Sequence, residues 1–213
     1  MSLFRLRKSG GPRDLELSMA GLKIGKSVLQ VYGSDHGLIA ALAKVVGLSG
    51  QAYAVAQTQG DGEAFERQAA DAGVLVDIKV AKIAVLPYDD DSLDLVVIKQ
   101  VLGGLTQNDR VLCLQQALRV LRPGGKALFS FFILDFYDGP GRSISPAYEF
   151  DHPFEGAGDV AVKYPEFPDT VIAYSRDRIR RSAELAGLDV ERIVPGLWSN
   201  RPGLAVNEQD LVL

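Results

Sequence analysis

The sequence predicts an α/β fold, a single doubly wound domain whose mostly parallel sheet carries helices on both faces. Short apolar runs alternate with amphipathic helical stretches along the chain, which is the pattern of successive βα units. The run "KALFSFFI" at 126–133 is apolar nearly throughout, as expected for a strand covered on both faces. With 213 residues, the chain can bury roughly 70% of its unfolded surface and form a core without disulfides or metal.

The first half of the chain predicts four strands joined by two helices and a surface turn. The strands are short apolar runs at 27–32, 52–57, 75–80 and 93–99. Helices are predicted over 36–47 and 62–73, and Gly73 ends the second because glycine readily takes the left-handed cap conformation. The turn "LPYDDDS" separates the third and fourth strands, and its three aspartates predict a solvated turn rather than a cation site.

In the second half, a helix over 107–121 stops where Pro123 cannot continue it, and the fifth strand at 126–133 follows. The segment 134–170 has no regular period and is rich in Gly, Pro and aromatic residues, which favours a lid or an insertion. The chain then predicts a helix over 175–188, begun by a serine cap, and strands at 189–194 and 208–213.

Composition argues against several classes of function. The net charge of −4 and pI near 5.2, with no long basic run, argue against nucleic acid as a partner. The apolar runs are shorter than the roughly 20 residues of a membrane span, and the start lacks the apolar run of a signal peptide. We therefore expect a cytoplasmic protein, in which the single cysteine, Cys113, is a buried packing thiol.

Three blocks resemble class I S-adenosylmethionine-dependent methyltransferases of the small-molecule type related to ubiquinone and menaquinone biosynthesis. "LPYDDDSLDLVV" (86–97) is similar to the family's acidic turn and fourth strand, and "RVLRPGG" (119–125) to its helix end and turn before the fifth strand. "YSRDRIRRSAELAGLDVERI" (174–193) resembles its late helix and sixth strand. The resemblance covers about 20–213, so we expect an N-terminal extension at 1–20 and one methyltransferase-like domain at 21–213.

The resemblance implies a seven-stranded sheet with an antiparallel last strand and S-adenosylmethionine over the carboxyl ends of the first strands. This is the crevice where ligands bind open α/β sheets. The positions it implies for the donor lie in the turn after the first strand, after the second and third strands, and at the end of the fourth. They are Tyr32, Gly33, Ser34, His36, Gly37, Gln57, Lys82, Ile83, Leu86 and Gln100.

Several of these positions depart from the family pattern. In one register Tyr32, Ser34 and His36 replace the three glycines of the first turn, whereas a shift of one residue recovers only Gly33 and Gly37; both registers stay open. Gln57 replaces the carboxylate that accepts the ribose hydroxyls, and Lys82, which has donors only, replaces an aspartate near adenine. Each change lowers the expected donor affinity.

Few residues are candidates for acid–base chemistry. His152, beside Asp151, is a candidate general base, with a surface loop histidine as the alternative. His36 is either a ligand-binding group at a helix start or a turn residue satisfied by local hydrogen bonds. The two histidines are far apart, and with one cysteine the sequence gives no metal-ligand pattern.

The aromatic residues after the fifth strand predict either an apolar pocket or a lid that packs on the sheet edge or forms a dimer contact. They are Phe136, Tyr137, Tyr148, Phe150, Phe154, Tyr164, Phe167 and Trp198. Two functions remain open: a methyltransferase acting on a small molecule that the sequence does not identify, and a non-catalytic methyltransferase-like protein that binds a ligand or a protein partner. A nicotinamide-dependent reductase is less consistent, because no G-x-G-x-x-G is present.

Overall fold

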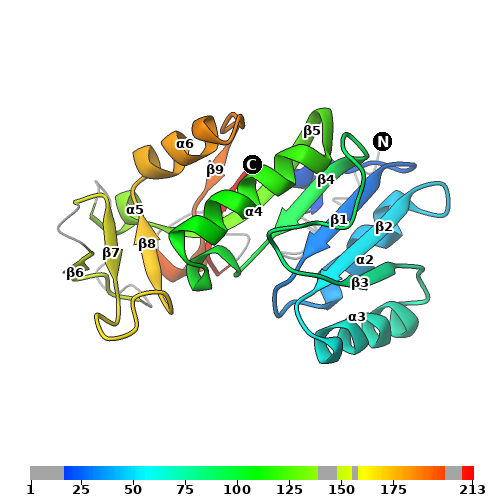
Figure 1. Cartoon of the computed structure of the whole chain (residues 1–213), viewed down its shortest axis with the longest axis horizontal. Coiled ribbons are helices and arrows are strands. Elements are labelled where there is room, and N and C mark those ends of the chain that lie inside the picture. Colours follow the sequence, from blue (N-terminus) through cyan, green and yellow to red (C-terminus); the bar gives the residue numbers. More distant parts are fainter. Residues whose placement is uncertain (1–16, 139–147, 155–157, 200–207) are drawn as a thin grey trace, which may run out of the picture.

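The computed structural model describes residues 17–138, 148–154, 158–199 and 208–213, and its centre is a mixed sheet (Figure 1). Seven strands follow one another across it in the order β3-β2-β1-β4-β5-β10-β9. Strands β3, β2, β1, β4 and β5 are parallel, and β10 is antiparallel to both β5 and β9. The predicted doubly wound sheet with an antiparallel last strand is confirmed. Its strands are β1 (Ser27–Val31), β2 (Gln51–Ala56), β3 (Asp77–Val80), β4 (Leu93–Ile98), β5 (Leu121–Ile133), β9 (Ile193–Val194) and β10 (Asp210–Val212).

Three further short strands branch from the end of β5, and the sequence did not predict them. β8 (Ile172–Tyr174) pairs in parallel with Phe132 and Ile133 of β5, and β7 (Val160–Val162) and β6 (His152–Pro153) continue antiparallel from it. A five-residue helix, α5 (Leu134–Asp138), precedes them. The expectation of an irregular segment over 134–170 is therefore wrong in part, because elements of two to five residues are too short to show a period. Residues 139–147 and 155–157 lie outside the described part.

Helices cover both faces of the sheet. Helices α2 (Gly37–Val46) and α3 (Gln59–Ala72) pack on one face, and α4 (Gln107–Val120) and α6 (Arg176–Leu185) on the other. The strands supply both cores by alternation, since successive side chains point to opposite faces. In β4, Leu95 and Val97 pack toward α2, whereas Val96 and Ile98 pack toward α4.

Most predicted boundaries agree with the structure within a few residues. Helix α3 begins at Gln59, three residues earlier than predicted, because Thr58 and Asp61 form a reciprocal capping box. It ends at Gly73 in the left-handed conformation (φ 66°), as predicted. β5 begins at Leu121 instead of 126, directly after α4.

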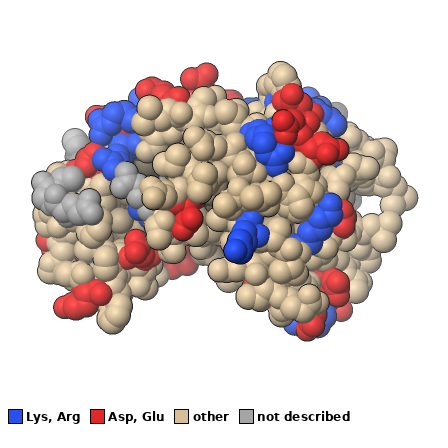
Figure 2. All heavy atoms as spheres, viewed as in Figure 1, with Lys and Arg blue, Asp and Glu red and all other residues tan. Residues whose placement is uncertain are grey.

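Charged side chains of both signs occur in small interspersed groups on the face shown in Figure 2. The turn at Asp89–Asp91 is exposed, and Asp90 pairs with Arg119 at 2.5 Å. The exposure of this turn agrees with the solvated turn that the sequence predicts. Asp94, at the start of β4, accepts hydrogen bonds from Lys26 Nζ (2.9 Å), Ser27 N (2.8 Å) and Arg122 Nη1 (3.2 Å). None of the helices in the described ranges has the length and apolar character needed to span a membrane.

Candidate functional site

The segments predicted to bind the donor meet at one edge of the sheet. β3, β2, β1 and β4 are parallel neighbours, so the residues that follow them lie together at the carboxyl edge. Direct contacts join these segments. Tyr32 after β1 hydrogen bonds to Ala81 after β3, and Ser34 Oγ donates to Gln100 Oε1 after β4 at 3.1 Å. The structure thus places the predicted positions around one edge, as the crevice rule requires.

The backbone after β1 needs a glycine at position 33. Gly33 has φ 88°, and a Cβ built there would lie 2.8 Å from the carbonyl oxygen of Lys99, which is closer than real Cβ atoms approach. Tyr32 also lies in the left-handed region, with φ 52°, a conformation that glycine adopts far more readily than tyrosine. The turn therefore retains a glycine-type backbone at 32 and 33 although only the second residue is glycine.

The side chain of Tyr32 lies across this edge. Its hydroxyl donates a 2.6 Å hydrogen bond to the carbonyl oxygen of Ala81. The residue is only 9% exposed, and it belongs to the same core cluster as Val55, Ile83 and Leu86. Burial raises the pKa of Tyr32, so the phenol stays protonated as a hydrogen-bond donor. A phenol thus occupies part of the edge where the resemblance implies the methyl donor.

Two buried polar atoms beside the turn lack hydrogen-bond partners within the described residues. Gln30 Nε2 donates to the carbonyl oxygens of Tyr32 (3.3 Å) and Asp35 (3.0 Å), which leaves Gln30 Oε1 buried and unpaired. His36 Nε2 is likewise unpaired, 4.0 Å from a carboxylate oxygen of Asp61, while its ring meets Phe65 edge-on at 4.8 Å. The interpretation of His36 as a turn residue satisfied by local hydrogen bonds is therefore wrong for Nε2.

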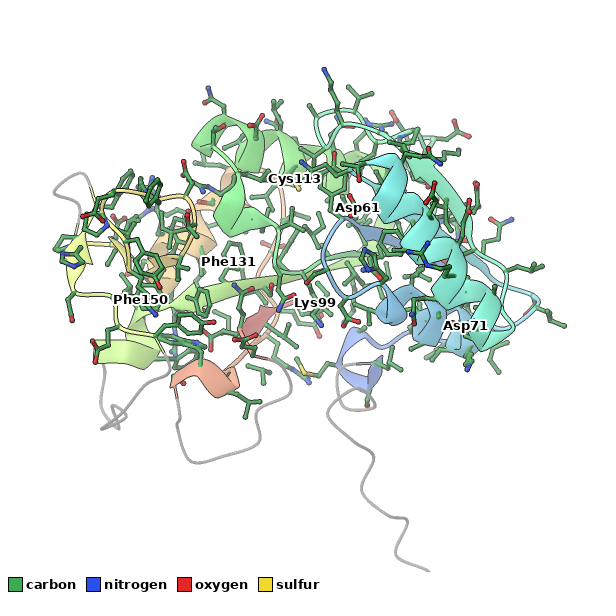
Figure 3. The ribbon with its side chains drawn as sticks, turned by 90° about the horizontal axis from the view of Figure 1, so that it is seen from below. Asp61, Asp71, Lys99, Cys113, Phe131 and Phe150 are labelled. Carbon is green, nitrogen blue, oxygen red and sulfur yellow. The ribbon has the colours of Figure 1, made fainter. Side chains whose placement is uncertain are left out.

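A buried lysine at the end of β4 was not among the predicted site residues. Lys99 is 6% exposed, and its Nζ lies 3.8 Å from a carboxylate oxygen of Asp35 in the turn after β1. Figure 3 shows Lys99 near the centre of the molecule, where β4 ends. The signal in the sequence is the charge that closes the apolar run "LDLVVIK". The next residue, Gln100, has φ 58°, and its N–H donates to Ser130 Oγ at 2.7 Å.

The remaining predicted contacts divide into exposed and buried residues. Gln57 and Lys82 are exposed at the ends of β2 and β3. Ile83 and Leu86 are buried in the core, and the N–H of Leu86 donates to Gln116 Oε1 at 3.0 Å. The methionine end of S-adenosylmethionine fits this edge, because Gln30 Oε1 and His36 Nε2 are unpaired there. The adenosine end fits poorly, because Tyr32 fills space beside β3 and Lys82 cannot accept a hydrogen bond.

His152 lies away from this edge. It is exposed on β6, at the opposite end of the molecule from β1–β3 (Figure 1). Residues of the described part form no group of three or more His, Cys, Asp or Glu side chains that could hold a metal ion.

Three of the aromatic residues after β5 pack around Phe132, which belongs to β5 itself. Phe132 lies 4.9 Å from Tyr148, 5.4 Å from Phe150 and 5.4 Å from Trp198, measured between ring centroids. Phe136 is buried, whereas Tyr164 and Phe167 are exposed. This arrangement favours a lid that packs on the end of the sheet over a pocket lined by these rings. The side chain of Tyr137 lies outside the described part.

Comparisons with known proteins agree with the geometry. Residues 31–129 match a family model described as a methyltransferase domain. The ubiquinone/menaquinone biosynthesis C-methyltransferase UbiE of Chromobacterium violaceum is 29% identical over 138 residues, 65% of this chain and 54% of that protein. UbiE of Laribacter hongkongensis is 30% identical over 116 residues, which are 54% of this chain and 47% of that protein. The chain thus spans about half the length of the curated relatives it matches.

Solved structures share the fold. An S-adenosylmethionine-dependent methyltransferase from Aquifex aeolicus superposes with a TM-score of 0.65 at 20% identity, covering 94% of this chain and 87% of that one. The [4+2]-cyclase SpnF superposes with a TM-score of 0.61 at 20% identity, covering 89% and 59%. At this level of identity the likeness establishes the fold alone, and the second structure carries a name outside methyl transfer.

Proposed function

Since residues 31–129 form a class I methyltransferase domain distantly related to the ubiquinone/menaquinone C-methyltransferases, we propose that the protein transfers a methyl group from S-adenosylmethionine to a small molecule and holds that donor weakly. The observation that carries the proposal is the meeting of the β1 turn, the ends of β2 and β3 and the end of β4 at one sheet edge. The matched region contains all of these segments. The weak affinity follows from Tyr32, whose phenol lies across that edge.

The proposed donor site uses the positions that the resemblance implies. The backbone at Gly33 would approach the methionine end, and Gln30 Oε1 and His36 Nε2 would supply unpaired polar atoms beside it. Gln57 would contact the ribose, and the Lys82–Leu86 segment and Gln100 would border adenosine. S-adenosylmethionine supplies an activated methyl group, so transfer depends mainly on holding an acceptor in line with it and needs few acid–base residues.

A non-catalytic methyltransferase-like protein is the second candidate. It is favoured by the combination of Tyr32 across the edge with Gln57 and Lys82 in place of acceptor carboxylates. This candidate predicts no donor binding even when the crevice is opened.

Calorimetric titration of the folded, ligand-free protein with S-adenosylmethionine and S-adenosylhomocysteine, with adenosine as a control, tests the proposal. We expect saturable binding of both ligands with dissociation constants from about 0.1 to 1 mM, since each 1.4 kcal/mol of lost contact costs tenfold in affinity. A micromolar constant would contradict weak binding. Absence of binding at several millimolar ligand would favour the non-catalytic candidate.

A further inference from the structure

A cavity lies between α4 and α6 over β5. Its volume is about 650 Å³, within the range of roughly 300–1,000 Å³ typical of small-molecule sites. None of the residues proposed to hold S-adenosylmethionine lines it. The cavity is therefore separate from the proposed donor site.

The shape and walls of this cavity suit an elongated apolar body. Its floor follows β5 from Gly124 to Phe131, seven residue steps, or about 23 Å at roughly 3.3 Å per residue. Between these ends the walls are mainly aliphatic side chains of α4, α6, the turn after α6, and β10. They include Leu114, Leu118, Ile179, Leu188 and Val212.

At the Phe131 end the cavity contains a buried hydroxyl that has no hydrogen-bond partner among the described residues. Tyr174 of β8 is 8% exposed, and its hydroxyl makes no hydrogen bond to any described residue. Burial raises the pKa of Tyr174 to about 12, so the hydroxyl stays protonated and can donate. An unpaired buried hydroxyl is costly in free energy, so this one is available to donate to a ligand that enters the cavity.

Two arginines line the same end. The Arg110 guanidinium lies over the Tyr174 ring, 5.4 Å from its centroid. Its Nη1 donates to the carbonyl oxygens of Leu102 and Leu105, while within the described residues Nε and Nη2 make no hydrogen bond. Guanidinium groups bind carboxylates well because their N–H groups match the two oxygens.

The charges that line this end of the cavity are positive. Arg178 also lines the cavity, and its Nη1 lies 3.6 Å from Asp159. Asp159 is shared with Arg181, which approaches it at 2.8 Å. The charge of Asp169 also acts on the Tyr174 hydroxyl. Of these charged groups and Arg110, only the two arginines Arg110 and Arg178 line the cavity, so an anionic head group is attracted to this end.

We infer that the cavity between α4 and α6 binds a small molecule with an elongated apolar body and a carboxylate head, the head lying at Tyr174 beside Arg110 and Arg178. The apolar body then lies along β5 between the two helices, where burial of its surface supplies most of the affinity. The Tyr174 hydroxyl and the arginines determine which end of the molecule enters first.

Calorimetric titration with dodecanoate and with dodecanol, an uncharged molecule of the same chain length, tests this inference. We expect saturable binding of dodecanoate and at least tenfold weaker binding of dodecanol. The Tyr174→Phe variant removes only the unpartnered hydroxyl, so it should fold normally and bind dodecanoate about tenfold more weakly. The loss for dodecanol should be smaller, because its neutral hydroxyl oxygen is a weaker acceptor than a carboxylate.

A second variant tests the location. Ala183 of α6 lines the cavity, and Ala183→Leu should weaken binding of both ligands at least tenfold by narrowing it. Ala70→Leu makes the same change on an exposed position of α3 and should leave binding intact. The inference is overturned if wild-type protein does not bind dodecanoate saturably, if the alcohol binds as tightly, or if folded Ala183→Leu protein retains wild-type affinity.

Discussion

The hydroxyl of Tyr32 donates a 2.6 Å hydrogen bond to the carbonyl oxygen of Ala81, which joins the turn after β1 to the segment after β3. The two residues are 49 positions apart in the sequence. A ligand that enters this edge must displace a buried phenol, lose its apolar packing and break a hydrogen bond worth about 1 kcal/mol net. We therefore expect this single contact to limit access to the proposed donor site.

Replacement of Tyr32 by glycine should open the site. The variant removes the phenol and places at φ 52° a residue that adopts this conformation without strain. We expect S-adenosylmethionine to bind at least tenfold more tightly to Tyr32→Gly than to wild-type protein, as measured by calorimetric titration. Unchanged or weaker affinity in folded variant protein would contradict the role given to Tyr32.

Asp91→Gly is the matched control for this experiment. Asp91 has φ 53°, nearly the same as Tyr32, but it lies exposed in the turn before β4. Substitution there relieves similar backbone strain without changing the crevice. Its affinity for S-adenosylmethionine should equal that of wild type, and an equal gain in both variants would trace the effect to general stabilisation.

Alanine at position 33 should destabilise the fold. Gly33 has φ 88°, and a Cβ added there would lie 2.8 Å from the carbonyl oxygen of Lys99. Neither the turn nor the end of β4 can move freely, because Lys99 and Asp35 also link them. We expect Gly33→Ala to lower the free energy of unfolding by about 2–4 kcal/mol in urea titrations.

Gly73→Ala separates backbone strain from steric clash. Gly73 also has a positive φ, 66°, but a Cβ there meets nothing within 4 Å. This variant should lose only about 1 kcal/mol, the cost of the left-handed conformation. If the two variants lose the same stability, the close approach at Gly33 contributes nothing.

Sequence reasoning located the long elements because they carry a clear period. The first four strands and helices α2 and α4 were predicted within a few residues, since each combines apolar alternation or a helical stripe with a cap or a proline. β6, β7 and β8 were missed, because two or three residues hold no period. Their places depend on pairing with the end of β5, which only the folded chain supplies.

The candidate site was predictable in its positions but not in its contacts. The resemblance named Tyr32 and Lys82, yet no local pattern shows that the Tyr32 phenol reaches Ala81. The pairing of Lys99 with Asp35 likewise depends on how β4 meets the turn after β1. The cavity beside Tyr174 depends on the spacing of two helices that are distant in the sequence, and periodicity carries no information on that spacing.

The thiol of Cys113 should be unreactive in the folded protein. As predicted, it is buried, on α4 with 1% exposure, and burial raises its pKa to about 12. The thiolate is the reactive form, so alkylation by iodoacetamide at pH 8 should be slow in buffer and fast in denaturing urea. Mass spectrometry of the labelled chain measures this directly, and rapid labelling without urea would show that α4 opens easily.

Asp210 should make the stability of the protein depend on pH. Its carboxylate is fully buried and accepts hydrogen bonds from Ile133 N (2.8 Å), Gly196 N (2.6 Å) and Trp198 Nε1 (2.8 Å). Burial outweighs these donors and raises the pKa of Asp210 to about 7. The folded state then retains the proton longer than the unfolded state. The contribution of Asp210 to the free energy of unfolding is complete below about pH 4 and is lost as pH rises toward 7.

Comparison of two aspartate variants isolates this effect from the other titrating groups. Each pKa unit corresponds to about 1.4 kcal/mol, so the stability advantage of wild type over Asp210→Asn should shrink by a few kcal/mol between pH 4 and 7.

The Asp94→Asn variant should show the opposite dependence on pH. Burial raises the pKa of Asp94, but the bonds from Ser27 and Lys26 and the charge of Arg122 outweigh it and lower the pKa overall. The stability advantage of wild type over Asp94→Asn should therefore increase as pH rises from about 2 to 5. Urea titrations between about pH 2 and 7 measure the free energy of unfolding of wild type and of each variant. If the advantage of wild type over both variants changes with pH in the same direction, burial does not dominate at Asp210.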